Sequence, residues 1–415
     1  PEEARPFIFC YDLKKDGLYD YGTKRNRGFA LDIVPTDMEL FIDNEAMEVA
    51  GWPNHGKRVL VGEVISPARL GELDIGKELL DPMNPGHYKK YDLSDYNGGV
   101  IKYNYDRADR WGQAKDAFAF GYMGWGFSDN NFPIEFIDTE NKTIHFKCPS
   151  VTGISDHAYY NTYRVYNLLE EIDIPGEYYI DKETGILYLY PPVGFSKNSK
   201  VQVSIAEEPL FAMEDTKYVS IHDIIFENTR GMAIYTQGCE NTIISNCVFR
   251  NVGMVAISFG LGFEDTPIFV HSAELIPAKR KIGGIKAHMW DNQFYNRQGG
   301  YNNTVIGCQV YNTGCGGIIL DGGDRYHLTP GNNKVVNCDI HDFNRIDTTY
   351  RPGVKVLGMA NSVSFCKIYN CPQQAIEFMG NDHVIEYNEI FNACTDNYDN
   401  GAIYRGSRPN SVNSA

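Results

Sequence analysis

The chain has 415 residues, 43% of them hydrophobic and 22% charged, so it can bury a core and is not disordered as a whole. Its 54 acidic residues outnumber 38 Lys and Arg, and the net charge of −16 argues against nucleic acid or an anionic membrane surface as partner. The sequence contains no run of about 18 apolar residues, so it does not predict insertion into a membrane. No feature of the sequence indicates a protein partner. The N-terminus carries neither an initiator Met nor a signal segment, so we expect a processed or cut chain.

Residues 1–200 are predicted to form an antiparallel β domain, a sandwich or a barrel, which could include a first strand of the next domain. Two hairpins are expected within it, one pairing 134–137 with 143–146 and the other pairing 177–180 with 186–190. Gly185 suits a left-handed position in the second turn.

A repeat begins near residue 217, with roughly 20 to 30 residues between most copies. Four of the six copies begin with Cys, and each copy has an apolar residue two positions after its first residue and an Asn or Asp two positions after that. The copies end at Asn228, Asn251, Asn312, Asp342, Asn370 and Asn392. Short alternating strands at this period predict an all-β fold, a right-handed parallel β-helix over residues 201–415.

Stacked coils lie about 4.8 Å apart, so equivalent residues should form ladders. We expect an interior apolar ladder of Phe226, Phe249, Val310, Ile340, Ile368 and Ile390. Beside it we expect reduced, buried thiols at Cys247, Cys308, Cys338 and Cys366. The alternatives are disulfides or a metal, but no pair has the CxxC spacing of a zinc site. The Asn column should occupy left-handed turn positions.

One long step between copies indicates an inserted loop over residues 260–302, which contains Trp290. Insertions in solenoids become loops on one face, often the binding face. A structural flap is the equal alternative.

Three segments carry a resemblance: residues 176–192, residues 380–390, and Asp399-Asn-Gly-Ala-Ile-Tyr404. They are similar to stretches of the β-helical glycoside hydrolases that include α-L-fucosidases, xylanases and β-xylosidases. The resemblance spans most of the chain, is specific for architecture, and is much weaker for substrate. Because such relatives continue for several more coils, it implies a chain truncated at its C-terminus, with part of the site missing.

The strand after each Asn turn aligns across the coils, and its middle residue should face outward, since apolar residues flank it. This column contains Ile319, Lys355, Glu377 and Tyr404, with Asp321 two residues beyond Ile319 on the same face. Two long turns, 344–351 and 393–400, should bring further polar residues to the same edge, namely Asp347, Arg351, Asp396 and Asp399.

Hydrolysis of a glycosidic bond needs two carboxyl groups, and Glu377 and Asp399 form the predicted pair. Lys355 is expected to keep Glu377 ionised, which leaves the general-acid role to Asp399. The alternatives are a surface salt bridge for Glu377 and a plain turn residue for Asp399. The remaining candidates for substrate binding are Lys355, Tyr404, Asp347, Arg351, Asp321, Asp396, His383 and Trp290, with turn capping as the alternative for His383.

The leading hypothesis is therefore a glycoside hydrolase for plant or host glycans, without a metal or cofactor. A polysaccharide lyase is the first alternative, with Lys355, Arg351 or a Ca²⁺ ion as its neutralising cation. A glycan-binding solenoid without activity is the second. Because glycans outside the cell are the natural substrates of such a solenoid, we expect a secreted or periplasmic protein.

Overall fold

A computed structural model describes residues 1–29, 31–68, 97–150, 152–157, 159–262, 281–285, 297–325 and 327–405. These fall into two compact units. The first contains residues 1–28, 37–68 and 97–205, and the second contains residues 29–36 together with the described residues from 206 onward. The described parts contain strands and short 3-10 turns, η1 (Arg5–Phe7), η2 (Leu13–Asp16), η5 (Asp106–Arg110) and η6 (Leu169–Glu171), and no α-helix. No helix in them could cross a membrane.

The first unit is built from three sheets that are almost entirely antiparallel. The largest runs β6 (Gly51–Trp52), β13 (Thr162–Tyr166), β10 (Phe118–Tyr122), β11 (Asn130–Asp138), β12 (Thr143–Phe146), β9 (Val100–Lys102) and β8 (Val64–Ser66), with β2 (Arg27–Gly28) on β11 and β7 (Val59–Leu60) on β13. A second runs β1 (Phe9–Asp12), β15 (Ile186–Leu189), β14 (Glu177–Asp181) and β5 (Glu48–Val49). The third runs β16 (Val201–Val203), β3 (Leu40–Ile42) and β4 (Glu45–Ala46).

Both predicted hairpins are confirmed. β11 pairs antiparallel with β12, and β14 pairs antiparallel with β15. Gly185 ends the second turn with a φ of 78°, the left-handed conformation expected there.

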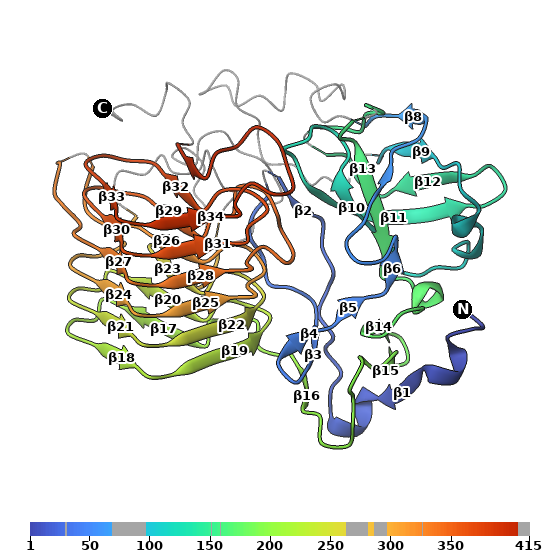
Figure 1. Cartoon of the computed structure of the whole chain (residues 1–415), viewed down its shortest axis with the longest axis horizontal. Coiled ribbons are helices and arrows are strands. Elements are labelled where there is room, and N and C mark those ends of the chain that lie inside the picture. The colour runs from blue at the N-terminus through green and yellow to red at the C-terminus, as the bar shows by residue number, and fades with distance from the viewer. Residues whose placement is uncertain are drawn as a thin grey trace. The chain divides into compact units, whose positions relative to one another are not determined.

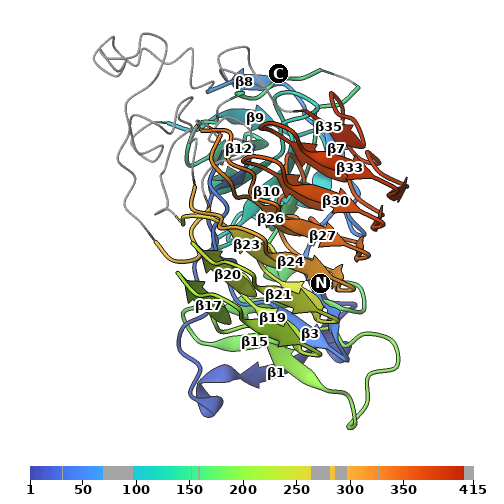
Figure 2. The ribbon, with the colours of Figure 1, turned by 90° about the vertical axis from the view of Figure 1, so that its left-hand side faces the viewer.

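The second unit is a right-handed parallel β-helix with three sheets, one strand of each sheet per coil (Figures 1 and 2). The first sheet contains β17 (Phe211–Glu214), β20 (Ile234–Gln237), β23 (Ile257–Phe259), β26 (Ile318–Leu320), β29 (Val354–Val356), β32 (Ile376–Phe378) and β35 (Ile403–Tyr404). The second contains β18 (Ser220–His222), β21 (Ile243–Ser245), β24 (Thr304–Ile306), β27 (Lys334–Val336), β30 (Ser362–Ser364) and β33 (Val384–Glu386). The third contains β19 (Ile225–Thr229), β22 (Val248–Val252), β25 (Gln309–Tyr311), β28 (Asp339–His341), β31 (Lys367–Tyr369) and β34 (Glu389–Phe391). The predicted fold class is confirmed.

The predicted ladders have the expected register. The apolar column from Phe226 to Ile390 pairs residue by residue along the third sheet. The Asn column that follows it has positive φ throughout, from 47° at Asn392 to 58° at Asn228. Each coil turns at this position through a left-handed conformation. Asn tolerates that conformation better than most other side chains, which explains why Asn or Asp recurs there.

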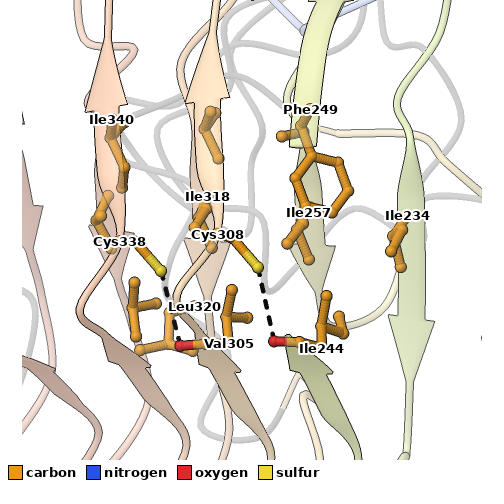
Figure 3. Close-up of a cluster of buried hydrophobic side chains, with 14 of the residues drawn as sticks. Ile234, Ile244, Phe249, Ile257, Val305, Cys308, Ile318, Leu320, Cys338 and Ile340 are labelled. Atoms are coloured by element: carbon orange, nitrogen blue, oxygen red, sulfur yellow. Dashed lines mark hydrogen bonds between the residues drawn. The ribbon is translucent and has the colours of Figure 1, made fainter. Parts of the chain in front are cut away.

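The four thiols of the ladder are buried in the core of the solenoid, and none of the ten cysteines forms a disulfide. Figure 3 shows Cys308 and Cys338 pointing into this core, each donating to a carbonyl of the preceding coil. The two bonds run to Ile244 O and Val305 O, at 3.7 and 3.8 Å. The prediction of stacked, reduced thiols is confirmed.

One segment of the N-terminal part packs with the solenoid. Ile33 forms a bridge with Ile285, its N–H donating to the Ile285 carbonyl at 3.0 Å. Residues 29–36 thus belong to the second unit although they precede most of the first in sequence. Most of the predicted insertion, including Trp290, lies outside the described residues.

Candidate functional site

The outward column of the first sheet exists in the predicted register. Ile319 pairs with Lys355, Lys355 with Glu377, and Glu377 with Tyr404 on neighbouring coils. Their flanking residues, such as Val354 and Ile376, lie in the solenoid core, so the column itself faces away from that core.

This outer face is nevertheless covered, which the strand pattern did not predict. Ile319 lies with Ile33, Cys315 and Leu357 in a second buried apolar cluster. Lys355 is only 7% exposed and Glu377 is fully buried. Alternation along a strand gives the direction of a side chain, whereas its exposure depends on what packs above it. A surface salt bridge is therefore excluded for Glu377.

Glu377 is the most unusual group of the column. Neither oxygen of its buried carboxyl has a hydrogen-bond partner among the described residues. Burial raises its pKa, and the nearby charges of Lys355 and Arg351 oppose this shift without cancelling it. This direction runs against the expectation that Lys355 keeps Glu377 ionised, because desolvation of the carboxylate outweighs the attraction of the ammonium group.

A small pocket, partly open to solvent, lies within the second unit beside this column. Its polar lining comes from Arg297, Tyr350, Arg351 and Lys355. Its apolar lining includes Ile33, Val255, Ile285, Cys315 and Ile319. The pocket thus adjoins Glu377, the ladder neighbour of Lys355.

Two more predicted carboxylates stand beside the cations of the pocket. Asp321 Oδ2 lies 3.3 Å from Arg297 Nε, and burial raises the pKa of Asp321 although Arg297 opposes the shift. Asp347 Oδ2 lies 3.9 Å from Arg351 Nε and accepts from Cys315 Sγ at 3.4 Å. Four predicted residues, Asp321, Asp347, Arg351 and Lys355, are therefore brought together with Glu377.

Tyr350 and Arg297 belong to this site and were not predicted. The Tyr350 ring lies 6.0 Å from the ring of Tyr404 in an edge-on arrangement. Burial raises the pKa of Tyr350, with further contributions from Asp399 and Glu377. Tyr350 lies in the predicted long turn 344–351, so the position of that turn could have identified it as a candidate site residue. Arg297 lies within the insertion, where no periodicity pointed to it.

Asp399 lies on the outer side of this group. It is exposed, and its φ of 53° marks a left-handed turn position. Its charge contributes to the raised pKa of Tyr404, so it stands near that half-buried phenol. Asp396 is half-buried in the same turn, with its N–H donating to the Pro372 carbonyl at 3.2 Å.

His383 lies in a buried polar column that the sequence analysis missed. In this column Asn303 N–H donates to Asn333 Oδ1 at 2.8 Å and Asn333 N–H to Asn361 Oδ1 at 2.9 Å. His383 Nδ1 continues the series by accepting from Asn361 N–H at 3.1 Å, while Nε2 bonds the Met379 carbonyl at 3.0 Å. Both ring nitrogens are thus engaged by the backbone, and burial lowers the pKa of His383. The signal was an Asn directly before each of three consecutive strands of the second sheet, β24, β27 and β30.

Comparison with solved structures finds distant likenesses. No family model and no curated protein matches the sequence. A solved structure named "Glycoside hydrolase" matches over 94% of this chain and 81% of its own, at 12% identity and a TM-score of 0.43. The tailspike protein gp49 from Pseudomonas phage LKA1 matches over 82% and 47%, at 11% identity and a TM-score of 0.26. The complex of XylC with xylose matches over 92% and 49%, at 10% identity and a TM-score of 0.32. The chain spans about half the length of the last two, and its fold is established by its own strand pairing.

Proposed function

We propose that this protein is a carbohydrate-active enzyme, specifically a glycoside hydrolase that uses Glu377 as its general acid and Asp399 as its base or nucleophile. The observation that carries the proposal is the buried Glu377 carboxyl without a hydrogen-bond partner among the described residues. A carboxyl group whose pKa is raised by burial suits the role of general acid near neutral pH. We also propose that the substrates of this enzyme are glycans outside the cell.

The second carboxyl group has the opposite environment. Asp399 is exposed to water, and it stands near Tyr404, the ladder neighbour of Glu377. Two carboxyl groups in contrasting surroundings are the pattern of an acid paired with a base or nucleophile. In this scheme Glu377 protonates the leaving oxygen, while Asp399 acts at the sugar carbon or on a water beside it.

The test is release of reducing ends from a panel of polysaccharides and aryl glycosides. Glu377→Gln and Asp399→Asn should each lower kcat by roughly 10²–10⁴-fold, the usual contribution of a positioned acid or base. If Glu377 is the acid, Glu377→Gln should lose least on aryl glycosides with good leaving groups, which need little protonation.

Two matched controls are available on the same coil as Glu377. Glu386→Gln changes an exposed carboxylate on β33, and Asp382→Asn changes an exposed turn Asp whose φ of 56° resembles that of Asp399. Both should keep full activity. Unchanged hydrolysis in Glu377→Gln and in Asp399→Asn would reject the pair.

A further inference from the structure

Two loops of the first unit lie at the same end of its largest sheet. One loop, residues 123–129, joins β10 to β11, and the other, which includes residues 152–157 and 159–161, leads into β13. Gly121, near the end of β10, pairs with the first residue of β11 and with the second residue of β13. The strand pairing therefore brings the two loops side by side.

Five aromatic rings lie on these loops. Trp125 of the first loop is 44% exposed, and its ring lies 5.2 Å from that of Phe127. On the second loop the His157 ring stacks on Tyr160, with 4.3 Å between the ring centroids. Tyr159 is 84% exposed, and its ring centroid lies 5.6 Å from that of His157. We call these five rings the aromatic platform.

The loops bury their aliphatic side chains and expose aromatic ones. Met123 and Ile154 are buried in the first unit, whereas Trp125 and Tyr159 remain in water. An exposed ring forgoes the free energy that its burial would supply, and a cluster of exposed rings is typical of a binding surface. The exposed carboxylate of Asp156 adds hydrogen-bond acceptors beside the rings.

The loops are held together by the fully buried Asn161 side chain. Its Nδ2 donates to the carbonyls of Tyr122 and Gly124 at 2.9 and 2.7 Å, which fixes the first loop. Its Oδ1 accepts from Ser155 Oγ at 2.6 Å and from the His157 N–H at 2.9 Å, which fixes the second. The aromatic platform is thus ordered before any ligand arrives, so binding costs little conformational entropy.

The close contact between the loops depends on Gly124, directly before Trp125. A Cβ at this position would lie 2.5 Å from Thr152 Oγ1 and 2.6 Å from the Gly153 carbonyl oxygen of the other loop. Only a residue without a side chain permits this approach. Trp125 therefore starts from the junction of the two loops, beside the segment that carries the other exposed rings.

We infer that the aromatic platform, together with Asp156, is a binding site for neutral sugar residues of a glycan. A pyranose ring presents C–H groups on its faces, which pack against aromatic rings, and hydroxyl groups at its rim, which hydrogen bond with carboxylate and imidazole groups. The inference goes beyond the proposed function, since it assigns glycan binding to the first unit and involves neither Glu377 nor Asp399.

The charge and composition of the loops favour a neutral sugar over other ligands. The net charge of −16 and the carboxylate of Asp156 repel an anionic glycan. Interfaces with other proteins are enriched in Met and Arg as well as aromatic residues. Here Met123 is buried, and neither loop contains an Arg.

The test measures binding of cellohexaose, xylohexaose and mannohexaose to the intact protein by calorimetry. We expect at least one of these neutral hexasaccharides to bind, with an affinity that salt leaves unchanged, because the ligand carries no charge to be screened. The Glu377→Gln protein should bind it equally well without turnover. Failure of all three to bind, or tighter binding of hexagalacturonic acid, would overturn the inference.

Variants then locate the site. Trp125→Ala and Tyr159→Ala should each weaken binding by roughly 10-fold or more, as truncation of an aromatic contact residue commonly does. Tyr159→Phe, which keeps the ring, should retain most of the affinity. Tyr19→Ala removes a Tyr of the same unit that is 70% exposed outside these loops, and it should bind as the unaltered protein does. If Trp125→Ala fails to fold, Tyr159→Ala provides the same comparison. Unchanged binding in either folded variant would reject the aromatic platform.

The same proteins separate this inference from the proposed function. Loss of binding in Trp125→Ala with unchanged hydrolysis in Glu377→Gln would retain the aromatic platform and reject the catalytic pair. Loss of hydrolysis in Glu377→Gln with full glycan binding in Trp125→Ala would do the reverse. A dimer in sedimentation experiments that Trp125→Ala dissociates, without glycan binding, would make a second copy of the chain the occupant and overturn the inference.

Discussion

Buried carboxyl groups with raised pKa are found in both units. In the second unit Glu377 and Asp321 belong to the proposed site. In the first unit Glu177 is fully buried, and its Oε2 accepts from the N–H groups of Asp173 and Ile174 at 2.9 and 3.1 Å. Burial outweighs these two hydrogen bonds and raises the pKa of Glu177 to about 7.

Glu177 should make the first unit less stable as the pH rises. Its pKa is about 7 in the folded chain against a reference value of 4.5, so the folded state holds the proton more tightly. Stability is therefore lost progressively as the pH passes from about 4.5 to above 7, by at most about 3.5 kcal/mol at about 1.4 kcal/mol per pKa unit. Glu177→Gln should flatten this dependence in urea unfolding measured at pH 5 and pH 8, conditions roughly bracketing the titration.

The exposed Glu135 on β11 supplies the comparison. Glu135→Gln should leave the pH dependence of unfolding as it is in the unaltered protein. An identical slope in Glu177→Gln would show that another group is responsible.

At the scale of elements, two polar columns hold the coils together in different ways. The column from Asn228 to Asn392 lies at turns with positive φ, where Asn relieves backbone strain. The column of Asn303, Asn333, Asn361 and His383 is mostly buried and bonds the backbone of neighbouring coils. The second column also reaches the site, since Asn333 Nδ2 donates to the Asp321 carbonyl at 2.6 Å.

Asn333→Ala should destabilise the solenoid by at least about 2 kcal/mol, since each buried backbone group left unsatisfied costs roughly 1–3 kcal/mol. The change removes the acceptor of Asn303 N–H and the donor to the carbonyls of Gly300 and Asp321. Urea unfolding, followed by far-UV circular dichroism, measures the loss. Lys334→Ala, at the neighbouring exposed position, should change stability by less than about 0.5 kcal/mol. If Asn333→Ala also changed stability by less than about 0.5 kcal/mol, water would be replacing the hydrogen bonds of the Asn333 amide.

At the scale of the whole molecule, the second unit is not continuous in sequence. Residues 29–36 supply Ile33 to the apolar cluster on the outer face of the first sheet. They also supply the Leu31 carbonyl, which accepts from Arg351 Nη2 at 2.8 Å. The proposed site therefore depends on a segment more than 170 residues before the solenoid begins.

Ile33→Ala should loosen the solenoid rather than the unit that surrounds this segment in sequence. Ile33 is 4% exposed, and removing a buried Ile side chain typically costs about 2–5 kcal/mol. Hydrogen exchange should accelerate in peptides from residues 206–262 and 297–405, but not in peptides from 97–150. Ile65→Ala, which shortens a side chain 55% exposed on β8, should alter neither set. Faster exchange confined to residues 97–150 would contradict the assignment of this segment.

The sequence by itself determined the periodic part of this protein. Coils stacked in register impose the same requirement at each level, so one repeat predicted the ladder from Phe226 to Ile390, the buried thiols and the left-handed turns. The same register predicted that Lys355, Glu377 and Tyr404 face one side, and the long turns placed Asp347 and Arg351 near them.

Only the tertiary structure decided the environment of that column. The cover comes from residues 29–36 and from Ile285 and Arg297 of the insertion, whose contacts with the coils follow no period and join parts of the chain distant in sequence. Burial, in turn, raises the pKa of Glu377, because desolvation of its carboxylate outweighs the attraction of Lys355. A strand pattern specifies which way a side chain points, but its charge depends on how much water the rest of the fold leaves around it.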